Sequence, residues 1–117
     1  MNKQEFLNLL TDIKVNEKNV SVVEATYKGK FDEVVNNIIS VCDKTLFIDG
    51  TRLLTYNEIL GAEEDLGVNF IQLHLLPLFD CGENDFIVYN ISKNRWSLFN
   101  IIDECAFKEV KTLEELL

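Results

Sequence analysis

The chain has 117 residues, which suit one domain spanning 1–117 and leave little room for two. Its apolar fraction of 47% is ordinary for a globular protein and argues against a disordered chain. Twenty acidic against eleven basic residues give a net charge of −9, which disfavours direct nucleic-acid binding because neutralising phosphates requires a stripe of Lys and Arg.

The first part of the chain predicts two or three helices. After Asn2, apolar residues share one face at the helical period: Phe6, Leu9, Leu10 and Ile13. The stretch Val20–Tyr27 is rich in β-branched residues and is compatible with a strand or a helix. The clearest helix is Phe31–Cys42, whose apolar residues recur at helical spacing, and four of them are expected in the core: Val34, Val35, Ile38 and Ile39.

The middle of the chain predicts a short hairpin and a third helix. The expected strands and turn are Thr45–Ile48, Asp49-Gly50 and Arg52–Leu54. Thr55 and Glu58 have the spacing of a capping box, in which each side chain satisfies a backbone N–H of the other. The helix that they begin is expected to end near Gly67.

The last fifty residues are typical of an antiparallel β-meander. Alternation of apolar residues predicts a half-buried strand at Phe70–Leu76, which Pro77 would end or place at a sheet edge. The expected elements after it are a turn at Asp80–Asp85, a strand at Phe86–Tyr89, a turn at Asn90–Arg95, a strand at Trp96–Ile102, an edge strand at Ala106–Val110 and a short helix at Leu113–Leu117. We therefore predict an α+β fold with a mostly antiparallel sheet packed against helices.

The three cysteines are Cys42, Cys81 and Cys105, which fit no Cys-x-x-Cys pattern. We expect two buried thiols and one near a turn, as suits a reducing cytosol. The first ten residues lack the uninterrupted apolar region of a secretory signal, and no apolar run approaches the roughly 20 residues that span a bilayer. A cytoplasmic protein without a membrane segment is the expectation.

No pattern in the sequence indicates catalysis, a metal or a cofactor. The only histidine, His74, falls on the predicted strand opposite its apolar face, and one histidine is poor material for a Ser-His-Asp or Cys-His site. The Asp80–Asp85 cluster has glycine at the third position of a calcium loop and aspartate at the sixth, so it fails the EF-hand spacing. We expect no enzyme activity and no cofactor.

The acidic residues are unevenly distributed. From Glu58 to Asp103 there are eight acids and two bases, Lys93 and Arg95. The excess suits either a surface that maintains solubility or a docking face for a basic partner. The partner-binding candidates are five acids and one aromatic residue that belongs either in the core or at the rim of an interface: Glu63, Glu64, Asp65, Glu83, Asp85 and Trp96.

From Arg52 to Leu117 the order of features resembles the SUKH superfamily, which contains Smi/Knr-type regulators of fungal cell-wall synthesis and many bacterial toxin-immunity proteins. The matching features are the strand leading into a helix at Arg52–Ile59, the strand ending in proline at Ile71–Pro77, the turn at Asp80–Asp85, the strand at Phe86–Asn90, Trp96, the acidic pair Asp103-Glu104 and the terminal Thr112–Leu117.

The resemblance implies an α+β fold with a curved, mostly antiparallel sheet and no enzymatic activity. It also implies a protein-binding role, most commonly the neutralisation of a cognate toxin, often a nuclease, by a bacterial immunity protein. Nuclease toxins have basic clefts, and a negative inhibitor surface accelerates association with them. The alternative that the resemblance leaves open is a regulatory or scaffolding protein of the Smi/Knr type.

Overall fold

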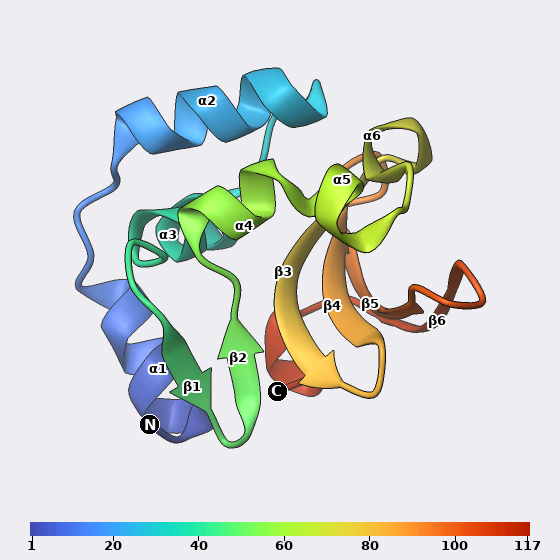
Figure 1. The fold of residues 1–117 in the computed structure, drawn as a ribbon. Coiled ribbons are helices and arrows are strands. Elements are labelled where there is room, and N and C mark those ends of the chain that lie inside the picture. The colour runs from blue at the N-terminus through green and yellow to red at the C-terminus, as the bar shows by residue number, and fades with distance from the viewer.

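The computed structural model describes residues 1–117 and has an α+β fold, in which a curved antiparallel sheet is packed against helices as predicted (Figure 1). The helices are α1 (Lys3–Thr11), α2 (Glu17–Tyr27), α3 (Glu33–Ser40), α4 (Tyr56–Leu60), α5 (Ala62–Leu66), α6 (Phe70–Leu73) and the 3₁₀ helix η1 (Leu113–Glu115). The strands are β1 (Leu46–Ile48), β2 (Thr51–Leu53), β3 (Leu75–Gly82), β4 (Asp85–Asn90), β5 (Arg95–Asn100) and β6 (Cys105–Val110). None of the helices has the length and apolar character needed to cross a bilayer.

Polar side chains fix where the N-terminal helices begin. The Asn2 side chain accepts a hydrogen bond from the Glu5 N–H and the Glu5 carboxylate accepts one from the Asn2 N–H, which completes a capping box for α1. The segment Val20–Tyr27, for which the sequence allowed a strand or a helix, is helical and belongs to α2. Asp32 caps α3, so this helix is shorter than the predicted Phe31–Cys42.

The region predicted as one helix from Thr55 to Gly67 is two short helices. The capping box of Thr55 and Glu58 is present and begins α4. The chain leaves helical geometry at Gly61 and resumes it in α5, which ends at Gly67 with φ +69°, a left-handed conformation that glycine adopts without strain.

The predicted strand at Phe70–Leu76 is wrong over its first half. Residues Phe70–Leu73 form α6, and His74 ends this helix with φ +60° before β3 begins. Alternation of apolar and polar residues suggested a strand, but the tertiary packing overrides it: Phe70 is buried against Phe99, whereas Leu73 is 44% exposed. His74 is an exposed helix-terminal residue rather than part of the sheet.

Pro77 does not end its strand, because β3 continues for five residues beyond it, but it lies where the strand is locally an edge, the second of the two predicted alternatives. The pairing of β2 with β3 involves only Phe79 and Asp80 of β3, so at Pro77 the strand has a single sheet neighbour, β4. A register shift between Pro77 and Phe79 also interrupts the ladder there. The missing N–H of proline is therefore accommodated at a locally one-sided, bulged position.

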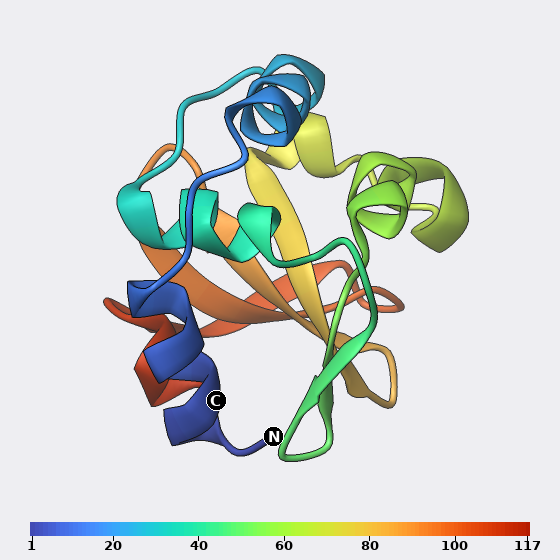
Figure 2. The same ribbon diagram turned by 90° about the vertical axis from the view of Figure 1, so that its left-hand side faces the viewer.

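All six strands pair antiparallel in the order β1-β2-β3-β4-β5-β6. The register aligns Phe79, Ile87 and Leu98 across three strands, and it aligns Phe86 with Phe99 on the opposite face. On the first face Phe6 of α1 packs edge-on against Phe79, with ring centroids 5.8 Å apart; on the second, Phe70 of α6 packs against Phe99. Helices therefore cover both faces of the central strands, as Figure 2 shows.

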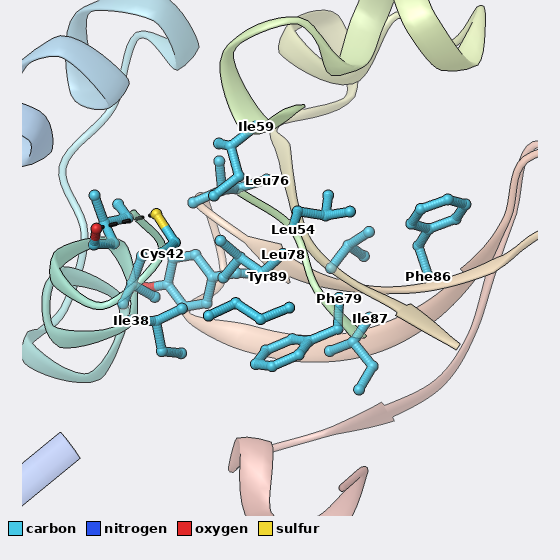
Figure 3. Close-up of a cluster of buried hydrophobic side chains, with 14 of the residues drawn as sticks. Ile38, Cys42, Leu54, Ile59, Leu76, Leu78, Phe79, Phe86, Ile87 and Tyr89 are labelled. Carbon is cyan, nitrogen blue, oxygen red and sulfur yellow. Dashed lines mark hydrogen bonds between the residues drawn. The ribbon is translucent and has the colours of Figure 1, made fainter. Parts of the chain in front are cut away.

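One cluster of 28 buried residues unites the helices and the sheet. Figure 3 shows Ile38 of α3 and Cys42 close to Tyr89 of β4, with the Cys42 thiol donating to the Ile39 carbonyl. Val35, Ile38 and Ile39 are buried as predicted, but Val34 is 42% exposed and lies outside the core. The expected cysteine pattern was also wrong in part: Cys42 is buried, Cys81 is half-buried and Cys105 is exposed.

Candidate functional site

Two turns lie together at one end of the sheet. Gly82 of β3 pairs with Asp85 of β4 around a tight turn in which Glu83 and Asn84 have φ +53° and +69°, the positive values of a two-residue type I′ hairpin. This turn is shorter than the predicted Asp80–Asp85. The Ile101 N–H donates to the Asn84 carbonyl at 3.0 Å, which holds the β5–β6 turn beside the β3–β4 turn.

Asn100, the last residue of β5, organises the second turn. Its side-chain oxygen accepts hydrogen bonds from the N–H groups of Ile102 and Asp103, each at 3.0 Å. Its amide nitrogen donates to Asp85 Oδ1 at 2.9 Å. One side chain thereby fixes the β5–β6 turn and ties it to β4, so the acids of the two turns are held in a defined arrangement.

We call this region the acidic end of the sheet and define it by six residues: Asp80, Glu83, Asp85, Ile102, Asp103 and Glu104. No lysine or arginine occurs in the two segments that form it, residues 80–85 and 100–105. None of the ion pairs in the structure includes Glu83, Asp103 or Glu104. Ile102 is 71% exposed and is the most exposed large apolar residue of the chain. Three carboxylates of this region therefore lack counter-charges, and the exposed Ile102 directly precedes one of them, Asp103, in the same turn.

A small cleft of about 80 Å³ adjoins this end, between α4, α5 and the strands β2 to β4. Arg52 lies in it and donates to both carboxylate oxygens of Glu58, at 2.7 and 3.1 Å, while its other contact is Asp80 at 3.6 Å. The hydrogen bond from Arg52 holds the pKa of Glu58 below its usual 4.5. Asp65 also lines the cleft, so three acids surround one base and the cleft remains net negative.

The predicted partner-binding acids separate into groups with different roles. Glu64 and Asp65 on α5 and Glu83 in the hairpin turn are exposed, as residues of a docking face must be. Glu63 is half-buried and accepts a hydrogen bond from the Ile71 N–H at 2.9 Å, so it helps to hold α6. Asp85 is also half-buried, through its contact with Asn100.

Trp96 is 3% exposed and lies against Tyr89, with ring centroids 5.2 Å apart. The core alternative for this residue is therefore confirmed, and its ring is not accessible to a partner. The exposed apolar side chain of the region is Ile102, which the sequence pattern assigned to the end of a strand. The residues Asp103 and Glu104 carried a signal in the sequence as an uninterrupted acidic pair beside a strand end.

No group of three or more His, Cys, Asp or Glu side chains is placed to hold a metal ion. Cys42 is fully buried, and this burial raises the pKa of its thiol to about 12. No family model, curated protein or solved structure matches the chain. The acidic end of the sheet is suited to electrostatic attraction of a basic molecule.

Proposed function

We propose that the chain is a non-enzymatic protein-binding domain, and that it acts in the bacterial cytoplasm as an immunity protein that binds a basic, nuclease-type toxin. The observation that carries the proposal is the acidic end of the sheet, where Glu83, Asp103 and Glu104 lack ion-pair partners and Ile102 is exposed in the same turn as Asp103. The resemblance to the SUKH superfamily supports the same reading.

The acids and Ile102 are expected to act on different stages of association with the partner. Carboxylates that are not neutralised within the protein sum their fields and attract a positively charged cleft over roughly 8 Å at physiological salt. An exposed apolar residue within such a rim supplies contact area once the partner has docked. The acids are therefore expected to determine mainly the association rate, and Ile102 mainly the dissociation rate.

The first test is charge reversal in both turns, Glu83→Lys with Asp103→Lys, on a partner captured from the source cell and identified by mass spectrometry. The variant should associate about tenfold more slowly at low salt and lose much of the salt dependence. The matched control, Glu17→Lys with Asp43→Lys, changes the net charge equally at exposed positions elsewhere. Association at the wild-type rate would reduce the acidic end to a solubility surface.

The second test is Ile102→Ser, which removes the apolar contact without changing charge. Dissociation should be about tenfold faster while the association rate stays close to the wild-type value. Phe47→Ser is a suitable control, because Phe47 is also exposed, at 56%, but lies on β1. Identification of an endogenous signalling or cell-wall complex as the partner, instead of a toxin, would favour the regulatory alternative.

A further inference from the structure

A second surface, separate from the acidic end of the sheet, has the form of a binding groove. It lies between α1, α3 and η1, which are neighbours in Figure 2, and its volume is about 550 Å³. Volumes of 300–1,000 Å³ are typical of sites that bury a ligand. Its floor and walls are mainly aliphatic, and the apolar lining residues are Leu7, Leu10, Ile13, Val15 and Val34.

The apolar stripe of α3 is wider than the core requires. Ile38 and Val35 are fully buried, yet Val34, on the same helix, is 42% exposed and faces the groove. Val15, in the connection between α1 and α2, is 36% exposed on the same groove. A single exposed valine is common on protein surfaces and does not by itself indicate a binding site. Here they converge on one concavity with three further aliphatic side chains, so the groove offers a continuous apolar surface.

The polar groups of the groove are fixed or acidic. Asn37 of α3 donates to the Leu10 carbonyl at 3.2 Å and so ties the two helices together across the groove. The charged side chains that line it are Glu33 and Glu114, both exposed, and the lining includes no base. The last turn of α1 also ends here without a basic residue, so the negative end of its dipole is not neutralised by a side chain.

From these observations we infer that the groove binds an apolar segment of a protein partner in which Lys or Arg residues adjoin the apolar side chains. The apolar floor takes the hydrophobic residues, while Glu33, Glu114 and the C-terminal end of α1 favour adjacent positive charge. The inference rests on the proposed protein-binding role but concerns a different surface. A second copy of the chain is a poor occupant, because each copy carries a net charge of −9 and the rim charges would repel.

The test uses a random-peptide phage library selected on the purified full chain, so it does not depend on the cognate partner. Enriched peptides should combine apolar residues with Lys or Arg, and in NMR titrations they should shift the amide signals of α1 and α3. Val34→Glu should weaken their binding about tenfold or more, since it places a charge on the apolar wall. Glu33→Lys with Glu114→Lys should weaken it through the rim.

The matched control is Val22→Glu, because Val22 is 38% exposed on α2 and does not line the groove. Wild-type affinity in this variant, with lost affinity in Val34→Glu, supports the groove. The inference is overturned if no peptide is enriched, if enriched peptides bind Val34→Glu as tightly as wild type, or if concentration-dependent dimers lost in Val34→Glu show that a second copy fills the groove. Each of these results leaves the charge-reversal test at the acidic end of the sheet unaffected.

Discussion

The central strands and the last strand of the sheet differ in their surroundings, although each contains β-favouring apolar residues. From Leu75 to Phe79, β3 is buried at every position, and so is β4 from Phe86 to Tyr89. In β6 five of the six residues are exposed, including Phe107 at 42%. Helices cover both faces of β3 and β4, whereas β6 pairs on one side only, with β5. Cover by other elements, rather than β propensity, decides which apolar residues stabilise this fold.

The β6 strand also carries a feature that protects an open edge. Lys108 has φ +54°, and a register shift occurs opposite it between Trp96 and Leu98 of β5. Such a bulge with a charged residue twists an edge strand and discourages pairing with other sheets. We therefore expect the buried residues packed on β3 and β4, the interior of the fold, to stabilise it. The exposed residues of β6, its margin, should contribute little to the free energy of unfolding.

The largest effect is expected for Ile38→Ala in the interior. Ile38 is fully buried on α3, so truncation removes apolar burial and leaves a cavity, at a cost of about 2–5 kcal/mol in the free energy of unfolding. Urea denaturation measures it. Val34→Ala on the same helix is the matched control and should change stability by about 0.5 kcal/mol or less, because its side chain is exposed. Equal losses in the two variants would contradict the assigned orientation of α3.

Tyr27→Phe should have the next largest effect. The Tyr27 hydroxyl donates to the Ile59 carbonyl at 2.6 Å in a buried position that joins α2 to α4, and the substitution leaves that carbonyl without its partner. A loss of about 1–3 kcal/mol is expected. The comparison variant is Tyr89→Phe, whose hydroxyl donates to the exposed Asn94 and should cost less because water can replace it. A larger loss for Tyr89→Phe than for Tyr27→Phe would be inconsistent with this difference in burial.

Glu58 on α4 is intermediate between the buried interior and the exposed margin, because its side chain is 38% exposed. Since solvent screens its ion pair with Arg52, Glu58→Gln should lower the free energy of unfolding by about 1 kcal/mol or less at pH 7. Arg52 lowers the folded-state pKa of Glu58, so the stabilisation is fully present above the ordinary value of 4.5 and is lost as the pH falls through the folded-state value. The stability difference between variant and wild type should therefore shrink below pH 4.5. Denaturation at several pH values, with Glu64→Gln as control, measures it; a difference that grows on acidification would refute the sign.

The smallest effect is expected at the margin. Phe107→Thr retains β propensity on β6 and removes a ring that is already 42% exposed, so the unfolding free energy should change by about 0.5 kcal/mol. Thermal unfolding of this variant beside Phe79→Leu, in the interior of β3, makes the comparison direct. If Phe107→Thr destabilises the protein as much as Phe79→Leu does, then β6 is part of the stabilising interior.

The sequence by itself determined the fold class, the helices and strands with strong local signals, and the charge. Capping boxes at Asn2/Glu5 and Thr55/Glu58 mark helix starts because their hydrogen bonds are local. The meander from β4 to β6 was predictable because short turns join strands that are adjacent in sequence. The excess of acidic over basic residues between Glu58 and Asp103 could be counted directly from the sequence.

Only the tertiary structure decided what depends on contacts between distant residues. The Phe70–Leu73 segment became helix through packing with Phe99 and the Glu63 hydrogen bond, neither of which has a local signal. Likewise, Val34 and Ile38 look equivalent in the helical pattern, but the sheet covers only one of them. The two turns of the acidic end lie together because β4 pairs with β5, which places Asp85 opposite Asn100, and because the Ile101 N–H donates to the Asn84 carbonyl. Periodicity identifies apolar faces, but which faces are covered, and which charges meet, follows from how the elements pack.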